Sequence, residues 1–453
     1  MNKLLESVFL FSEVIIIILY LTCTEYGEGV HPGAASTQAS ALASEQKVSK
    51  YYPIFQDVHV MIFIGFGFLM VFLKTHSWTS VGYNFLIAAF VLQISILITG
   101  FWHQVLHPEE GFHKIQLDIP ALIIGDFGAG CVLITFGAIL GKCSLHQLWV
   151  IAVLEIIFYG LNEAICAGKM GAVDMGGSMY VHTFGAYFGC AASYFFQPKK
   201  AMTDARCEGD YNSQLVAMVG TIFLWMYWPS FNGALAADFQ QQRVFVNTVM
   251  AISASCISAC GITRILEGKL DMEVVLNATL AGGVSVGSAS DLVVTAGVSM
   301  AIGTLAGLVS AIGFLKLNGF LKAKIGLHDT CGVHNLHGLP GVLGGIIGAI
   351  SASLADSSFD SDTALEATFP KLAEGRTTSE QGWIQLAALG ITLGISIGGG
   401  IISGFIASKC GHPEDLFDDK AHFMHVEYVE TQAVEMATVP AGTDRKEDPA
   451  QMQ

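Results

Sequence analysis

Charged residues are scarce in this sequence. Asp, Glu, Lys and Arg make up 13% of the 453 residues, whereas soluble globular domains carry roughly 25%. A chain of this length with so few charges lacks the polar surface that a soluble multidomain enzyme needs. Basic residues are the scarcest, with 22 against 38 acidic residues, and the net charge of −16 leaves no basic surface for nucleic acid.

The cysteines and asparagines are not placed as disulfides, metal sites or N-linked glycans would require. Most of the ten cysteines fall inside apolar stretches, where cysteine is a small hydrophobic residue rather than part of a disulfide framework. Cys256 and Cys260 share a helix face, but further metal ligands are missing nearby, so we expect no metal and no cofactor. The only N-glycosylation sequon begins at Asn277 inside an apolar stretch, and we expect no glycan there.

Long apolar stretches are what the sequence has in abundance. Each is about 20 residues or more, enough to cross a bilayer core of about 30 Å as a helix, and backbone groups in lipid must pair with one another, which favours helices. Twelve such stretches lie at about 4–23, 55–74, 80–101, 117–141, 145–166, 178–197, 213–233, 243–263, 271–290, 292–317, 330–353 and 383–407. The sequence therefore predicts an all-α polytopic membrane protein with about twelve transmembrane helices.

The basic residues predict the orientation of these helices. If all twelve stretches span and the N-terminus is cytoplasmic, fifteen Lys and Arg residues face the cytoplasm and seven face outward, in line with the positive-inside rule. The C-terminus is then cytoplasmic as well. The stretch 4–23 has a basic start and a short apolar run, so it is either an extra span or a cleaved signal peptide. The charge count fits both readings.

We expect two regions along the chain. Residues 1–410 form the transmembrane domain, and residues 411–453 form an acidic, solvated cytoplasmic tail. The start of this tail, HPEDLFDDKAHFMHVEYV, is richer in aromatic residues. It is therefore able to dock on the cytoplasmic face of the membrane domain.

One pattern of residues occurs twice. DMGGSMYVHTFGAYFG begins at Asp174 and DTCGVHNLHGLPGVLG begins at Asp329, and both have Asp first, Gly three residues on, His eight on and Gly fifteen on. The copies open the sixth and eleventh apolar stretches, so their helices cross the membrane in opposite directions. This predicts a 5+5 inverted repeat with halves at about 55–197 and 213–353. The stretches 4–23 and 383–407 lie outside the repeat.

The spacing places two histidines at one depth. Eight helical residues rise about 12 Å, and half the hydrocarbon core is about 15 Å, so an Asp at each membrane face puts its His near the midplane. Under the pseudo-two-fold axis, His182 and His337 are expected to meet there. A single histidine at this depth is typical of an interhelical hydrogen bond. A symmetric pair of costly ionisable groups indicates a transport path instead.

The two Asp residues have two open interpretations. Asp174 and Asp329 each stand where a helix begins, so each is able to cap free backbone N–H groups. Each also stands near one end of the expected path, where a carboxylate attracts cations.

These motifs resemble the Rh glycoprotein branch of the ammonium transporter (Amt/Rh) family. The two repeated stretches, together with GDFGAG and WMYWPSFNGA, occur in the order of the family, and the resemblance covers residues 1–425. It implies a homotrimer, in the plasma membrane, with one conduction path through each protomer. The family's first outer loop commonly has a glycosylation site, whereas residues 24–52 contain no Asn.

The resemblance also implies roles for particular residues. His182 and His337 match the twin pore histidines, and Phe127 and Phe231 match a pair of gating phenylalanines. Glu163 matches a vestibule acid at the outer side, with Asp174 and Asp329 near the two ends of the path. His334 is a weaker candidate for lining the path, because Met179 stands at its place in the first copy.

The expected function is transport of ammonium and ammonia, without enzymatic activity. Ammonium is drawn to an acidic vestibule, sheds its proton near the gate, and passes the histidines as neutral ammonia; methylammonium is a further candidate substrate. A carbon dioxide channel with the same apolar path is the alternative. An enzyme with a metal at His182, His334 and His337, and a non-conducting scaffold or ammonium sensor, are the remaining rivals.

Overall fold

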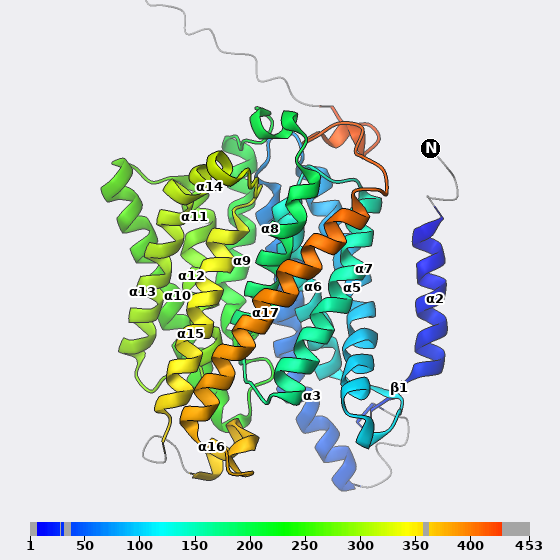
Figure 1. Cartoon of the computed structure of the whole chain (residues 1–453), viewed down its shortest axis with the longest axis vertical. Helices are drawn as coiled ribbons and strands as arrows, with labels where there is room; N and C mark the ends of the chain where they lie inside the picture. Colours follow the sequence, from blue (N-terminus) through cyan, green and yellow to red (C-terminus); the bar gives the residue numbers. More distant parts are fainter. Residues whose placement is uncertain (1–6, 28, 31–37, 357–361, 428–453) are drawn as a thin grey trace, which may run out of the picture.

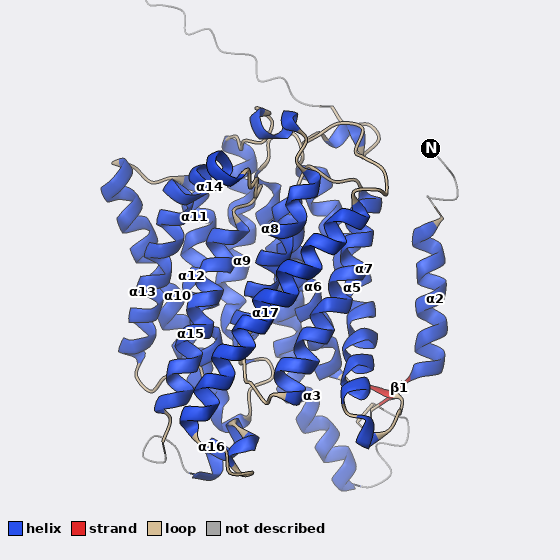
Figure 2. Cartoon of the chain, viewed as in Figure 1, coloured by secondary structure: helices blue, strands red, loops and turns tan. Residues whose placement is uncertain are grey.

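The computed structural model describes residues 7–27, 29–30, 38–356 and 362–427. Figure 1 shows an upright bundle, and Figure 2 shows that helices make up nearly all of it. In this part of the chain, nine helices are long and apolar enough to cross a membrane. The other three expected spans are also helical, but they are short or broken into several turns: Val8–Cys23 (α2), 178–196 and 272–289. The chain is therefore an integral multi-pass membrane protein with the predicted all-α fold.

The two halves of the repeat follow one another along the chain. The first half contains α3 (Gln38–Val60), which helical turns including α4 (Gly67–Leu69) continue to Phe72, then α5 (Ser77–Leu106), α6 (Ile119–Ile139), α7 (Leu145–Glu163) and α8 (Phe184–Ser193). The second half contains α9 (Tyr211–Gly233), α10 (Asp238–Glu267), α11 (Met272–Asn277), α12 (Ala281–Val286), α13 (Ala296–Ile312), α14 (Asn318–Ile325) and α15 (Leu339–Leu354). Figure 1 shows α8 and α15 running in opposite directions, as an inverted repeat requires.

The remaining elements lie around this bundle. Helix α2 stands at one side of it (Figure 1), and a short parallel sheet of β1 (Thr24–Tyr26) and β2 (Ile115–Leu117) ties its lower end to the α5–α6 connection. After the repeat come α16 (Asp362–Thr368) and α17 (Thr378–Ala407), which crosses the bundle diagonally. Helix α2 begins on the side of the bundle where α17 ends (Figure 1).

Polar residues fix where several long helices begin. Ser144 and Gln147 form a reciprocal capping box at the start of α7, and Thr377 and Glu380 do the same for α17. The side chain of Asp118 accepts a backbone N–H at the start of α6. Each cap satisfies N–H groups that the first turn of a helix leaves unpaired.

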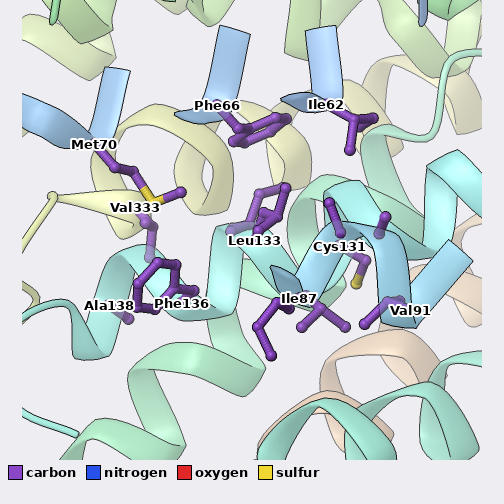
Figure 3. Close-up of a cluster of buried hydrophobic side chains, with 14 of the residues drawn as sticks. Ile62, Phe66, Met70, Ile87, Val91, Cys131, Leu133, Phe136, Ala138 and Val333 are labelled. Carbon is purple, nitrogen blue, oxygen red and sulfur yellow. The ribbon is translucent and has the colours of Figure 1, made fainter. Parts of the chain in front are cut away.

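The centre of the bundle is a continuous apolar core. Figure 3 shows Ile62 and Phe66, on the turns after α3, pointing toward Cys131 and Leu133 of α6. Ile62, Cys131 and Leu133 are completely buried. Helices in lipid gain little from excluding water and are held together by close packing. This core therefore fixes α3 against α6, and both helices contribute to the site described below.

The start of the tail is docked on the end of the bundle where α17 ends, while residues 428–453 lie outside the described part of the chain. The carboxylate of Asp419 accepts hydrogen bonds from the backbone N–H groups of Trp78 (3.0 Å) and Thr79 (2.7 Å), and so caps the start of α5 from a distant part of the sequence. Arg206 donates to Asp415 at 2.8 Å, and this guanidinium holds the pKa of the Asp415 carboxyl well below its usual range. The aromatic part of the tail thus docks as the sequence allowed.

Candidate functional site

The two copies of the repeated pattern bring their histidines into contact. His182 Nδ1 and His337 Nδ1 are 3.2 Å apart, and the two ring planes differ by only 10°. The residues are 2% and 3% exposed. This distance allows one imidazole to donate a hydrogen bond to the other.

The local backbone explains the glycine in each copy. His182 lies on a π-helical turn, Ser178–Thr183, and His337 lies on a second one, His334–Gly338. Just before these turns stand Gly177 and Gly332, with φ of 71° and 68°. Residues with a side chain rarely adopt this left-handed conformation. The glycine three residues after each Asp is therefore needed to turn the chain into the helix that carries the histidine.

Aromatic side chains enclose the histidine pair. His182 stacks near Trp228, with ring centroids 5.5 Å apart, and Phe231 is 5.6 Å away. The Phe231 ring in turn lies 4.7 Å from the ring of Phe127. On the other side, His337 stacks near Phe66 at 6.1 Å. The two phenylalanines singled out from the family motifs, on α6 and α9, therefore meet beside His182.

On the side of His337 that faces α11 and α14, two cavities follow. The first is about 30 Å³, close to the volume of one small molecule, and is lined by apolar side chains together with His337 and Asn277. The second is about 440 Å³, and it shares Phe72, Asn277 and Cys331 with the first. Its lining is polar and includes Glu273 and Asp329. A small apolar cavity beside His337 and a wider polar cavity are therefore neighbours that share part of their lining.

Asp174 is occupied on both carboxylate oxygens. Its Oδ2 accepts from the backbone N–H groups of Met179 and Tyr180, each at 2.8 Å, and its Oδ1 accepts from the Ser288 hydroxyl. This geometry supports the capping interpretation for Asp174. Its role in a vestibule stays a prediction.

Asp329 is occupied on one oxygen only. Its Oδ2 accepts from the backbone N–H of His334 at 2.8 Å, so it also caps its helix. Its Oδ1 is buried without a hydrogen-bond partner among the described residues. Asp329 lines the 440 Å³ cavity, so a carboxylate with one unsatisfied oxygen forms part of the wall of that cavity.

Two other predicted residues lie further from the histidine pair. Glu163 ends α7 and lines a separate cavity of about 400 Å³ between α5, α6 and α7, together with His103. The ring of His334 contacts Tyr187 on α8, with centroids 5.5 Å apart. The vestibule role of Glu163 and the pore-lining role of His334 stay predictions.

Sequence reasoning missed several residues that line the path. Phe66 and Trp228 flank the histidines, and Asn277 and Glu273 line the cavities below them. A polar sequon inside an apolar stretch was the one available signal for Asn277. The aromatic residues gave no signal, because the chain contains 29 Phe and 6 Trp.

The arrangement allows hydrogen bonding to a neutral molecule. If one neutral imidazole donates from Nδ1 to the other, its own Nε2 is an acceptor, and the Nε2 of its partner carries the remaining hydrogen. The pair then offers one acceptor and one donor. Among the described residues, His, Cys, Asp and Glu gather nowhere in a group of three that could hold a metal ion.

Comparisons with known proteins agree with this geometry. Residues 18–412 match the model of the Ammonium Transporter Family. Ammonium transporter Rh type B of Oryzias latipes is 44% identical over 425 residues, which cover 91% of this chain and 90% of that protein. The Rh type B protein of Xenopus tropicalis is 47% identical over 383 residues, covering 82% of each chain.

Solved structures match as well. Rh50 of Nitrosomonas europaea, described with conduction by the Rhesus protein family of channels, has a TM-score of 0.72 and 29% identity, covering 85% of this chain and 94% of that one. Mep2 of Saccharomyces cerevisiae has a TM-score of 0.60 at 17% identity, covering 78% and 84%. The second match speaks for the fold alone.

Proposed function

The chain belongs to the Ammonium Transporter Family, and we propose that it moves ammonium nitrogen across the membrane as neutral ammonia, past the His182–His337 pair. One observation carries this proposal above the others. Two buried histidines from opposite halves of the chain lie 3.2 Å apart between an aromatic enclosure and an apolar passage. The family establishes ammonium or ammonia as the transported species, and this geometry supports the route.

The enclosure favours a neutral molecule. A cation at the bilayer centre costs from a few to well over ten kcal/mol, depending on the estimate, and the rings and aliphatic groups around the histidines supply no carboxylate to offset that cost. Ammonia has one lone pair and three N–H groups, so it is able to accept from one imidazole nitrogen and donate to the other. The route therefore begins with loss of a proton from ammonium at the outer side.

The inner cavity then receives the product. Ammonia that leaves His337 crosses the 30 Å³ passage and enters the polar cavity, where Glu273 and the free oxygen of Asp329 favour the ammonium cation. There ammonia takes up a proton from the inner solution and becomes ammonium again. Each ammonia molecule that crosses therefore leaves one proton on the outer side and takes one from the inner side. Phe127 and Phe231 close the outer side of the histidine pair, with ring centroids 4.7 Å apart, and we assign them as the gate.

The assembly and its placement are part of the same proposal. We propose a homotrimer in the plasma membrane, with one path in each protomer and both chain ends in the cytoplasm. Burial of the histidine pair within one chain supports one path in each protomer. The start of α2 and the end of α17 at the same end of the bundle (Figure 1) support placing both chain ends on one side of the membrane. Native mass spectrometry of the purified protein is expected to give a mass of three chains.

Stopped-flow recording tests the route. Proteoliposomes that hold a pH dye are mixed with an ammonium gradient, and the rate of internal alkalinisation is compared with that of empty liposomes. We expect the wild-type protein to accelerate alkalinisation, and His182→Ala and His337→Ala to reduce that acceleration. His412→Ala, on an exposed part of the tail, is the matched control and should behave as the wild type.

Two outcomes would redirect the proposal. Wild-type rates for both histidine variants would place the route elsewhere in the molecule. If the folded wild-type protein accelerates carbon dioxide entry but not alkalinisation, the protein is a carbon dioxide channel. Uptake of methylammonium in the same liposomes then defines the substrate range.

A further inference from the structure

Helix α3 holds the residue directly before the gate phenylalanine of α9. Ser230 Oγ donates a hydrogen bond of 2.6 Å to Asp57 Oδ2, and Phe231 is the next residue along α9. The side chains of neighbouring residues on a helix point about 100° apart. Fixing the direction of Ser230 therefore fixes the direction in which Phe231 points.

The same helix holds the residue directly before the other gate phenylalanine. His59 Nδ1 lies 3.1 Å from each carboxylate oxygen of Asp126, and Phe127 follows Asp126 on α6. The Asp126 side chain is completely buried, whereas that of His59 is 39% exposed. Asp57 and His59 are two residues apart on α3, so one helix anchors both gate residues.

Both gate helices are locally weak where these anchors lie. Pro229, two residues before Phe231, lies inside α9, where it removes a backbone hydrogen bond and disturbs the helix. Phe127 is followed by Gly128, where a Cβ atom would come within 2.2 Å of Ser95 Oγ on α5. This glycine lets α6 approach α5 closely. Contacts from α3 supply the support that the two helices lack.

These bonds are costly features in a membrane protein. A buried carboxylate between spans is expensive and is retained where it has a partner and a use. Asp126 is separated from the polar inner cavity by the histidine pair and the passage below it, and its described contacts lead to α3 instead. Simple helix association could be achieved with apolar residues, so the position of both bonds beside the gate calls for another explanation.

We propose that Asp57 and His59 are positioning residues for the gate: they set the separation of Phe127 and Phe231 and thereby the size of substrate that the path admits. This inference rests on the gate assigned above. Loss of either bond lets one phenylalanine turn, so the path discriminates less well between ammonia and the larger methylamine. Neither residue touches the transported molecule.

The test measures selectivity rather than rate alone. Alkalinisation of proteoliposomes by methylammonium is divided by alkalinisation by ammonium for each variant, so the amount of inserted protein cancels. Asp57→Ala removes the acceptor of the first hydrogen bond, and Ser230→Ala removes its donor. The double variant shows whether the two residues act as one pair. Ser230→Ala also covers the case in which Asp57→Ala does not assemble. His59→Ala removes the second bond.

Conservative variants and controls complete the set. Asp57→Asn keeps an acceptor oxygen, and His59→Asn keeps a donor nitrogen near the place of Nδ1. Phe231→Ala and Phe127→Ala give the selectivity of an opened gate. Gln56→Ala, an exposed position directly before Asp57 on α3, is the matched control.

We expect Asp57→Ala and Ser230→Ala to shift the ratio in the same direction as Phe231→Ala, by about tenfold, the lower end of the effect that losing a hydrogen bond to a charged group has on an equilibrium. The double variant should shift it no further. His59→Ala should shift the ratio in the same direction as Phe127→Ala. The ratios of Asp57→Asn and His59→Asn should lie closer to that of the wild type, and the ratio of Gln56→Ala should equal the wild-type ratio.

Other outcomes are decisive in the opposite sense. If the Phe variants shift the ratio but the Asp57, Ser230 and His59 variants do not, the positioning role is wrong and the gate assignment stands. If neither Phe variant shifts the ratio, the gate assignment fails and this inference fails with it.

Discussion

The acids at the two ends of the path have the same place in the repeat but different surroundings. Asp174 has hydrogen bonds on both oxygens, whereas Asp329 has one bonded oxygen and one buried oxygen without a donor among the described residues. Two backbone hydrogen bonds at equivalent positions of the repeat allow the two halves to be aligned. Gly176 N–H donates to Gly287 O at the outer end, and Cys331 N–H donates to Gly137 O at the inner end.

This register identifies the counterparts in the two halves. Gly137 corresponds to Gly287, so Ala138 stands where Ser288 stands in the other half. The hydroxyl that occupies the second oxygen of Asp174 is thus replaced by a methyl group beside Asp329. A single small substitution between the halves leaves one acid as a structural cap and makes the other available to a cation.

The same register explains why the phenylalanine pair is found at one end only. It aligns Phe127 with Asn277, so the inner half has a small polar residue where the outer half has a gate ring. Asn277 lines both inner cavities. The repeat therefore builds one scaffold twice, with the Phe127–Phe231 ring pair at the His182 end and a polar cavity beyond the His337 end.

Removing the two acids is the strongest way to test this comparison. Asp174→Ala leaves two buried N–H groups and a hydroxyl without their acceptor, so we expect a loss of on the order of 3 kcal/mol or more, at about 1–3 kcal/mol for each unsatisfied group. Asp329→Ala strands one N–H group and should cost about 1–3 kcal/mol. Thermal unfolding of the purified variants measures the difference. Equal losses would contradict the structural reading of Asp174.

Adding a ring to the inner half should block the path. Asn277→Phe places an aromatic side chain in a passage of about 30 Å³, which is too small to hold it, because cores tolerate little added volume. We expect ammonia conduction to fall by about tenfold or more, with Asn277→Ala as the control that leaves the passage open. Conduction by Asn277→Phe at the wild-type rate would place the path away from Asn277.

Substitutions at Ser288 and Ala138 should make the hydrogen bonding of Asp174 and Asp329 more alike. Ser288→Ala gives Asp174 the surroundings that Asp329 has, and we expect a loss of about 1.5–3 kcal/mol, the range for a hydrogen bond to a charged group. Ala138→Ser offers Asp329 a second donor and should weaken ammonium entry from the inner side. Unfolding measurements and transport with reversed gradients read out the two changes. An unchanged stability for Ser288→Ala would show that this hydroxyl contributes nothing.

Acidity on the tail side should have the smallest effect. Burial lowers the pKa of His422 from its ordinary 6.5, against smaller opposite effects of Asp419, Asp418 and Glu414, and His422 Nδ1 lies 2.8 Å from the Tyr83 hydroxyl. Protonation is unfavourable in the docked tail, so docking is fully present above pH 6.5 and weakens as the pH falls below it.

Hydrogen exchange of residues 411–427 as a function of pH measures this effect. We expect the protection factors, which are corrected for the intrinsic pH dependence of amide exchange, to fall below the ordinary pKa of His422, and His422→Gln should remove most of the change. Buried His76, whose pKa is lowered to about 3 by burial and by the nearby His422, contributes in the same direction. Protection factors that are independent of pH in the wild type would contradict a role for either imidazole.

Much of the fold could be predicted from the sequence, because lipid imposes length and polarity on each span. Twelve stretches and the inverted repeat followed from hydropathy and from one repeated spacing. The breaks in the helical segments 178–196 and 272–289 could not be predicted, since π-helical and tight turns there depend on neighbouring helices. The anchors from α3 were also invisible, because Asp57 and Asp126 are far apart in sequence and each alone is an ordinary acid.

The sequence by itself determined the spans, the two-fold repeat and the meeting of His182 with His337, because hydrophobic length and helical rise are local properties of a chain. Only the tertiary structure decided that Asp174 has donors on both oxygens while Asp329 keeps one oxygen without a donor among the described residues, and that α3 contacts the residues directly before Phe127 and Phe231. Those differences arise where side chains from separate helices come into contact. Neither segment alone determines which hydrogen-bonding atoms are paired in such a contact.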